Sequence, residues 1–318
     1  MHRYFFLALL ILLPLSSCTK KDTLADIREA VTLDLTGDVN PDSLRSYVTW
    51  MQNMGTRFCL SENRRDVARS IRNKFISFGY PGARLDSFLL QITYRNTEYI
   101  LWQYNVTARL EGSDGSDSLT VIGGHYDSIL SGSGSDPFIM APGANDNASG
   151  VAAALELARV MKKNDFKPGG DVEFVAFAAE ELGLHGSKDY ARKAYETGVK
   201  IKMMLNNDMI AYEPSANSSG WKVNIMDYYN SRGLLSIAGR LAARYTLLDT
   251  YNDNSLNRYS DSYSFSQYGF PALFFFIDAD DPDYHTVDDV AGNCNFIYSR
   301  EIVNISAALV VERNIFGN

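Results

Sequence analysis

Residues that can bind a metal or transfer protons directly follow several apolar segments of the sequence. His125 and Asp127 follow "LTVIGG", the adjacent carboxylates Glu180 and Glu181 follow "VEFVAFAA", and Asp208 follows "KMMLNN". Imidazole and carboxylate groups suit Zn²⁺ or another borderline divalent ion, and they are also common general acids and bases. The sequence therefore indicates metal-assisted or acid–base chemistry.

Two more residues extend this set. Asp146 lies in "GANDNASG", immediately before an expected helix, and His285 lies in "DYHTVDD", soon after "PALFFFID". Each alone has an ordinary explanation, because an aspartate can cap a helix and a single histidine after a strand usually only forms hydrogen bonds. Of the four histidines, His2 belongs to an expected signal peptide, and His185 in "LGLHGS" is interpreted as a loop residue. The other two both lie where ligands are expected.

The segments that would position these residues alternate between strand and helix patterns. Short β-prone runs predict strands at residues 89–96, 104–110, 119–128, 172–180, 202–210, 221–227 and 271–278. Apolar periodicity predicts helices at residues 41–54, 62–80, 149–164, 186–198, 231–245 and 299–316. Several strands are too continuously apolar to have a solvated face. The alternation therefore predicts an α/β fold, a three-layer sandwich with a mixed, largely parallel central sheet.

The predicted sheet explains why the chemical residues recur after strands. In open α/β sheets, ligands bind beyond the carboxyl ends of the strands, so these residues are expected to converge at one edge. Five ligands are more than one catalytic zinc needs, and a pair of ions roughly 3.5–4 Å apart, bridged by one carboxylate, would accommodate them. One of the glutamates Glu180 and Glu181 could then bind metal while its neighbour accepts a proton from water.

Composition and connecting segments limit the alternatives. With 46% hydrophobic residues among 318, the chain can bury a large core. Its net charge of −8 and scattered Lys and Arg argue against nucleic acid as a partner. The Gly/Ser-rich segments 111–118 and 131–143 are predicted to be a hairpin-like connection and a surface loop. No repeat or interdomain linker is visible, so residues 40–318 are predicted to form one domain.

The N-terminal residues have the pattern of an export signal. "MHRYFFLALLILLPLSSC" has a short basic start, an apolar stretch too short to span a bilayer stably, and small residues before Cys18. Its "LSSC" ending resembles a bacterial lipoprotein box, which implies removal of residues 1–17, lipid on Cys18 and a membrane-anchored, exported protein of the cell envelope. An ordinary secretory peptide is the alternative. Residues 18–39 are polar and are predicted to form a tether.

Two cysteines remain after Cys18. In an oxidising compartment, Cys59 and Cys294 could pair. Two free buried thiols are the alternative, and the sequence slightly favours it.

Five ordered motifs, "GGHYDS", "GANDNASG", "AAEELGLHGS", "NNDMI" and "YHTVDD", resemble those of the M28 family of metallo-aminopeptidases. The resemblance covers roughly residues 40 to 318 and implies the aminopeptidase-like fold of zinc-dependent exopeptidases. It also implies that peptides with a free N-terminus are the substrates, and that two Zn²⁺ ions, for which Co²⁺ or Mn²⁺ can substitute, are the cofactors.

The resemblance also implies a role for each site residue. Asp146 corresponds to the bridging carboxylate, His125 and Asp208 complete one zinc site, and Glu181 and His285 complete the other. Glu180 corresponds to the general base. The two remaining members of the set are Asp127, which supports the histidine side of the site, and Tyr284, which corresponds to a tyrosine that hydrogen-bonds the developing oxyanion.

One departure and two alternatives remain. Many family members read Ser-Asp-His where this chain has "YSDSYSF", so Ser262 stands in place of a common histidine, and the substrate pocket is expected to differ there. A glutaminyl cyclase-like acyltransferase with one zinc resembles the same fold, although "AAEELGLHGS" looks more like the hydrolase version. The second alternative is a surface-exposed binding protein that has lost activity.

Overall fold

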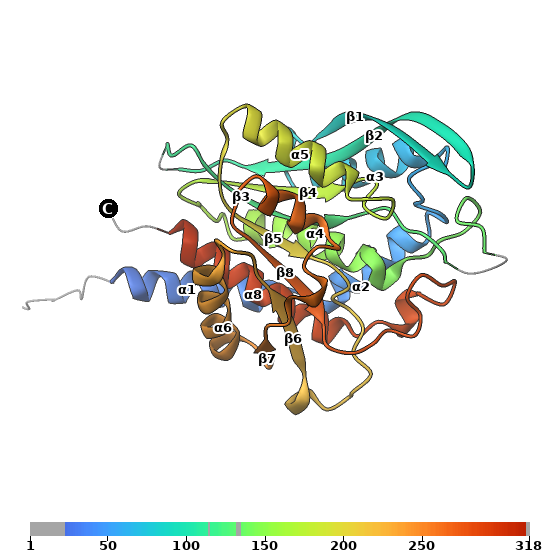
Figure 1. Ribbon diagram of the computed structural model, residues 1–318. Helices are drawn as coiled ribbons and strands as arrows, with labels where there is room; N and C mark the ends of the chain where they lie inside the picture. Colours follow the sequence, from blue (N-terminus) through green and yellow to red (C-terminus); the bar gives the residue numbers. More distant parts are fainter. Residues whose placement is uncertain (1–22, 114, 132–134, 316–318) are drawn as a thin grey trace, which may run out of the picture.

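A mixed eight-stranded sheet crosses the computed structural model, which describes residues 23–113, 115–131 and 135–315 (Figure 1). Its strands are β1 (Arg84–Tyr94), β2 (Thr97–Leu110), β3 (Ser118–His125), β4 (Asp171–Phe177), β5 (Lys200–Asn207), β6 (Lys222–Met226), β7 (Asp249–Tyr251) and β8 (Ala272–Ile277). Their order is β1-β2-β4-β3-β5-β8-β6-β7. The four central strands β4, β3, β5 and β8 pair in parallel, so their carboxyl ends meet at one edge.

Helices cover both faces of this sheet. They are α1 (Leu24–Asp38), α2 (Pro41–Gln52), α3 (Arg64–Ser77), α4 (Ser149–Lys163), α5 (His185–Glu196), α6 (Arg232–Tyr245), α7 (Asp261–Gln267) and α8 (Phe296–Asn314). On the α5 and α7 side, the rings of Phe177, Tyr190 and Phe265 contact one another. On the other side, Phe174 of β4 packs against Phe75 of α3. The predicted α/β fold with a mixed, mostly parallel sheet is confirmed.

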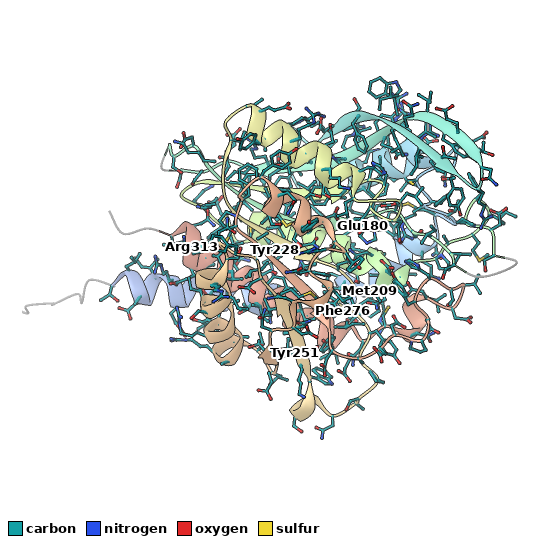
Figure 2. The ribbon with its side chains drawn as sticks, in the orientation of Figure 1. Glu180, Met209, Tyr228, Tyr251, Phe276 and Arg313 are labelled. Atoms are coloured by element: carbon teal, nitrogen blue, oxygen red, sulfur yellow. The ribbon has the colours of Figure 1, made fainter. Side chains whose placement is uncertain are left out.

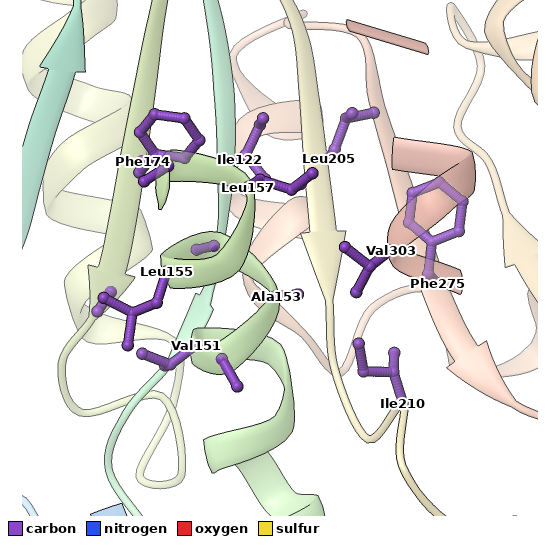
Figure 3. Packing of buried hydrophobic residues seen from close by; sticks show 14 of the residues in the cluster. Ile122, Val151, Ala153, Leu155, Leu157, Phe174, Leu205, Ile210, Phe275 and Val303 are labelled. Atoms are coloured by element: carbon purple, nitrogen blue, oxygen red, sulfur yellow. The ribbon is translucent and has the colours of Figure 1, made fainter. Parts of the chain in front are cut away.

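The core between the sheet and helix α4 is closely packed. Ile122, Leu157 and Phe174 lie within it, together with Val303 from α8 (Figure 3). Small residues allow this approach, because a Cβ on Gly150 would lie 2.0 Å from the backbone oxygen of Asn207. The start of α4 therefore sits directly beside the tip of β5.

Two connections differ from the sequence predictions. The strand predicted at residues 89–96 ends at Tyr94. Arg95 and Asn96 instead form the turn of a hairpin between β1 and β2, and both have positive φ angles, as a two-residue turn requires. Segment 111–118 was predicted to be hairpin-like, and this is wrong, because it joins β2 to β3 and β4 lies between these two strands.

The segment assigned to a polar tether contains the helix α1. Thr23 caps this helix, and Leu35 is fully buried. The Arg28 guanidinium donates to the backbone oxygen of Ile315 at 2.7 Å, which ties α1 to the end of α8. The predicted signal peptide 1–17 and Cys18 lie outside the described residues. None of the helices within the described ranges is long and apolar enough to cross a membrane.

The two cysteines in the described residues are unpaired. Cys59 is buried and Cys294 is partly buried, and both are free thiols. The alternative of free thiols is therefore the one that the structure shows.

Candidate metal centre

The candidate site is built from segments that follow the central strands. His125 is the last residue of β3, and Asp208 directly follows β5. Glu180 and Glu181 follow β4 after Ala179, which adopts a positive φ of 56°. Non-glycine residues rarely adopt this conformation, and such strain is common at functional sites.

Two loops supply the remaining ligands. Asp146 has non-helical backbone angles, and α4 begins only after Ala148, so the helix-cap explanation of Asp146 does not hold. His285 lies in the loop after β8 and also has a positive φ of 57°. Both loops reach the edge where the central strands end.

The first group of potential ligands consists of His125, Asp146 and Asp208. His125 Nε2 lies 3.3 Å from Asp146 Oδ1 and 3.4 Å from Asp208 Oδ1. The other ring nitrogen, Nδ1, lies 3.1 Å from the backbone oxygen of Asp127. This hydrogen bond directs Nε2 into the site, as for histidines that bind metal ions.

The second group consists of Asp146, Glu181 and His285. His285 Nε2 lies 3.0 Å from both Asp146 Oδ2 and Glu181 Oε2. In each group, one ligand atom from every member lies within 4.8 Å of the others. Asp146 belongs to both groups and offers Oδ1 to one and Oδ2 to the other, which is the arrangement of a bridging carboxylate.

The donor atoms fit divalent metal ions. His285 Nε2 and Glu181 Oε1 are buried and form no hydrogen bond of acceptable geometry within the described residues. Buried nitrogen and oxygen atoms that lack a hydrogen-bond partner are suitable donors for Zn²⁺.

The pKa values of two potential ligands are shifted in the metal-free protein. Burial, together with the charge of Asp146, raises the pKa of Glu181 to about 8. Burial disfavours protonated His285, but its contacts with Asp146 and Glu181 outweigh this and raise its pKa to about 10. In the metal-free protein, protons on Glu181 and His285 therefore supply part of the positive charge that metal ions would otherwise provide.

Glu180 lies beside both groups without belonging to either. Its Oε2 is 3.8 Å from His125 Nε2, and only 8% of the residue is exposed. Burial raises its pKa well above the usual value, His125 opposes this, and the neighbouring carboxylate of Glu181 adds to it. A carboxylate with raised proton affinity beside a metal centre can serve as a general base.

Asp127 fixes the turn that carries the two glutamates. Its Oδ1 accepts the amide N–H of Glu180 at 3.0 Å, and its Oδ2 accepts that of Glu181 at 3.3 Å. Asp127 also contacts His125 through its backbone oxygen. Asp127 therefore contacts groups on both sides of the site.

A cavity of about 410 Å³ opens onto these residues. Glu180, Met209 and Phe276, all labelled in Figure 2, line it. Tyr284 also lines the cavity, is 49% exposed, and stacks on the His285 ring at 3.8 Å. The structure thus brings all eight predicted site residues together: His125, Asp127, Asp146, Glu180, Glu181, Asp208, Tyr284 and His285.

Of the neighbouring residues, His185 differs from its sequence interpretation. His185 is the first residue of α5 and not a loop residue, and its Nε2 lies 3.1 Å from the backbone oxygen of Leu182. It belongs to neither group of potential ligands. The hydroxyl of Ser262 pairs with that of Tyr228 at 2.9 Å.

Four supporting residues were missed by sequence reasoning: Arg57, Ser260, Asp261 and Asp289. Ser260 Oγ donates to Asp208 Oδ2 at 2.6 Å, and Asn206 Nδ2 donates to Ser260 Oγ. Asp261 is fully buried, and burial raises its pKa to about 7. Ser260 and Asp261 lie in "YSDSYSF" and Asp289 ends "YHTVDD", so these two motifs contained three of the four residues without indicating their roles.

Comparison with known proteins found a matching family and related sequences. The model of Peptidase family M28 matches residues 105–310. A "Probable zinc metalloprotease" of Pyricularia oryzae is 34% identical over 214 residues, which are 62% of this chain and 39% of that protein. "Leucine aminopeptidase 1" of Ajellomyces capsulatus is 26% identical over 291 residues, which are 87% of this chain and 72% of that protein.

Solved structures share the fold. The LapA aminopeptidase of Legionella pneumophila superposes with a TM-score of 0.76 at 20% identity, covering 95% of this chain and 79% of that one. A glutaminyl cyclase of Fimbriiglobus ruber superposes with a TM-score of 0.68 at 17% identity, covering 86% of this chain and 95% of that one. At these identities, both comparisons concern the fold alone.

Proposed function

Because the chain belongs to peptidase family M28, we propose that it is a zinc-dependent aminopeptidase that removes N-terminal residues from peptides. The observation that carries this proposal is the position of Asp146, shared by two groups of potential ligands, with Glu180 beside both. Related proteins described as a zinc metalloprotease and a leucine aminopeptidase support it.

The two groups would hold one zinc ion each. His125 and Asp208 would bind the first, Glu181 and His285 the second, and Asp146 would bridge them. Ions held by these residues would supply a water molecule of lowered pKa and polarisation of a peptide carbonyl. Co²⁺ and Mn²⁺ are expected to substitute because they accept the same nitrogen and oxygen donors.

The protein's own side chains would move the proton and orient the substrate. Glu180 accepts a proton from the attacking water and returns it to the departing amine. The amide N–H groups of Glu180 and Glu181 are held by Asp127, so the base keeps its position during this transfer. The hydroxyl of Tyr284 would donate a hydrogen bond to the oxygen that becomes negative as the carbonyl is attacked.

The residues that line the cavity indicate which part of a peptide would bind there. The apolar ones include Met209, Leu256, Phe274, Phe276 and Ile277. These side chains favour an apolar N-terminal residue, because burial of its side chain contributes about 25 cal/mol per Å². The acidic residues that line the cavity, which include Asp280 and Asp281 in addition to the proposed metal ligands, would attract the positively charged α-amino group. A peptide with a free N-terminus therefore fits the site.

A panel of aminoacyl arylamides, assayed with and without a metal chelator, tests this function. We expect hydrolysis of substrates with apolar N-terminal residues, loss of activity with chelator, and recovery when zinc is added. Elemental analysis of protein purified without chelator should find two zinc ions per chain. An active protein whose cavity holds no metal in anomalous scattering would overturn the proposal.

The same experiments separate the alternatives. A cyclase would contain one zinc per chain and would convert a peptide that begins with glutamine into its cyclised form. An inactive binding protein would hydrolyse none of the arylamides. The two complete ligand groups favour the hydrolase over both.

We also propose that the protein is exported and anchored to the membrane through lipid on Cys18. The support is the N-terminal sequence alone, with its apolar stretch and the "LSSC" motif. Mass spectrometry of the mature N-terminus tests this proposal. Lipid on Cys18, and loss of membrane association in Cys18→Ala, are expected, whereas an unmodified Cys18 would overturn it.

A further inference from the structure

Arg57 is a completely buried arginine that lies beneath the metal centre. Its guanidinium donates only to backbone oxygens, and within the described residues no carboxylate forms an ion pair with it. The nearby carboxylates of Asp289 and Asp127 favour its charge, but burying a charge without a direct ion pair is still costly. This cost suggests that the side chain has a role in positioning its hydrogen-bond partners, in addition to filling space in the core.

The hydrogen bonds of Arg57 join the two segments that carry His125 and Asp146. Nε donates to the backbone oxygen of Tyr126, the residue after His125, at 2.8 Å. Nη1 donates to the oxygen of Pro142 at 2.6 Å, and Nη2 donates to that of Gly143 at 2.7 Å. The rigid fork of the guanidinium therefore fixes the distance between the tip of β3 and the segment before Asp146.

Asp289 holds the same segment from the other side. Its Oδ1 accepts the amide N–H of Asn145 at 2.7 Å, and its Oδ2 accepts that of Asp146 at 3.0 Å. Its backbone oxygen accepts the amide of Ala144 at 3.1 Å. Residues 142–146 are thus held between Arg57 and Asp289, which together are called the Asp146 clamp.

Gly143 shows how little room the Asp146 clamp leaves. A Cβ at this position would lie 2.4 Å from the backbone oxygen of Asp146 and 2.8 Å from Arg57 Nη2. The φ angle of Gly143 is also positive, at 49°. The segment is therefore packed too closely to shift without disturbing Arg57 or Asp146.

We propose that Arg57 is a positioning residue which, with Asp289, sets Asp146 so that its two oxygens can bind two metal ions at once. A zinc–carboxylate oxygen distance is about 2.0–2.2 Å, so a bridging carboxylate must satisfy two such distances together. A small displacement of residues 142–146 would weaken both. The inference rests on the proposed metal centre, but its tests do not require peptide hydrolysis.

The charge of Arg57 and its proposed positioning role predict opposite effects of Arg57→Met on zinc affinity. A buried cation repels a metal ion, so its removal should tighten zinc binding if only charge mattered. Loss of the Asp146 clamp should weaken zinc binding instead. Supporting residues around a metal typically change its affinity by about 10- to 100-fold when mutated. Whether Arg57→Met binds zinc more tightly or more weakly therefore distinguishes the effect of charge from the effect of position.

Zinc affinity, measured by competition with a chromophoric chelator, is the main experiment. We expect Arg57→Met to bind zinc about 10- to 100-fold more weakly than the original chain. Arg57→Lys should not restore the affinity, because one ammonium nitrogen cannot span the oxygens of Tyr126 and Gly143. Unchanged or tighter binding in Arg57→Met, or full recovery in Arg57→Lys, would overturn the proposal.

Two further variants separate positioning from general loss of stability. Gly143→Ala leaves the charge unchanged and should also weaken zinc binding, so it provides a test even if Arg57→Met does not fold. Arg159→Met removes a partly buried arginine that bonds Glu156 and the backbone oxygen of Asp38, away from the site. It should lower the denaturation midpoint without changing zinc affinity. Equal effects of Arg159→Met and Arg57→Met on zinc affinity would contradict the positioning role.

Hydrogen exchange adds a readout in the metal-free protein. The amides of residues 144–146 should exchange faster in Arg57→Met than in the original chain, while those of α8 should not change. If zinc binds as expected but no peptide is hydrolysed, the proposed function fails and the clamp stands. If peptides are hydrolysed and Arg57→Met binds zinc normally, the clamp fails and the proposed function stands.

Discussion

Asp127 Oδ1 accepts the backbone amide of Glu180 at 3.0 Å, so the segment after β3 holds the acid that follows β4. Because β3 and β4 are parallel neighbours, with His125 opposite Phe177, their ends meet at this point. The two strands thereby place a potential base beside a potential metal ligand.

Glu180→Gln should retain zinc and lose most peptide hydrolysis. The amide keeps the shape of the side chain but cannot accept the proton, and general base catalysis contributes about 10²- to 10⁴-fold. The value of kcat and the zinc content of the variant check this. Glu181→Gln is the matched control, because it should lose metal from one site. Full activity of Glu180→Gln would show that another group is the base.

Asp146→Ala should release both metal ions. Its two oxygens face different groups of potential ligands, at 3.3 Å from His125 Nε2 and 3.0 Å from His285 Nε2. Removing either Asp208 or Glu181 should affect mainly one ion. Elemental analysis of the three alanine variants at equal zinc concentration distinguishes these outcomes, and retention of one tightly bound ion by Asp146→Ala would contradict a bridging role.

Ser260→Ala should weaken zinc binding at the site that contains Asp208. The hydroxyl of Ser260 accepts a bond from Asn206, so its own proton is directed to Asp208 Oδ2, which leaves Oδ1 to face His125. We expect affinity at one of the two sites to fall by about 10-fold. Ser262→Ala is the control, because that hydroxyl bonds Tyr228 instead of a ligand. Equal effects of the two substitutions would argue against the role of Ser260.

Tyr284→Phe should lower kcat by about 100-fold and leave KM nearly unchanged. The phenylalanine ring can keep the stacking on His285, so only the hydroxyl is lost. A donor to a developing oxyanion contributes mainly in the transition state. Steady-state kinetics on one arylamide provides the measurement. Tyr259→Phe, an exposed residue of the same cavity, should have little effect on kcat.

The sheet and its functional edge could be predicted because their signals are local. Each central strand is a short apolar run, and His125 and Asp208 lie at or directly after the ends of such runs. Shorter elements carried too little pattern, since β7 has three residues and α7 has seven. The helix α1 was hidden by its polar composition, because it buries only Thr32 and Leu35.

Supporting residues could not be predicted for a different reason. Arg57 contacts backbone oxygens 69 to 86 residues further along the chain. Because every residue has a backbone oxygen, the type of the partner residue gives no indication of such a contact. Asp289 is similar, because it accepts backbone amides some 140 residues away. Such contacts depend on the folded path of the chain, so only the structure shows them.

The metal-free protein should lose stability as pH rises from about 4 to 7. Burial raises the pKa of Asp261 to about 7, whereas an unfolded aspartate titrates near 3.9. Between these values the folded chain binds more protons than the unfolded chain, so the free energy of unfolding falls with rising pH. Burial acts on Asp289 in the same direction and raises its pKa to about 7. Each group should weaken folding by roughly 2–4 kcal/mol across this window.

Urea denaturation at about pH 4.5 and 7.5, with chelator present, measures this loss. Asp261→Asn should reduce the difference between the two pH values, because the amide remains neutral throughout. Zinc should also reduce it, since bound cations stabilise the nearby carboxylates and bind only the folded chain. A variant with the same pH dependence as the original chain would show that Asp261 is ionised in the folded protein without cost. In that case other buried groups, such as Glu181 with its raised pKa of about 8, would have to account for any remaining loss.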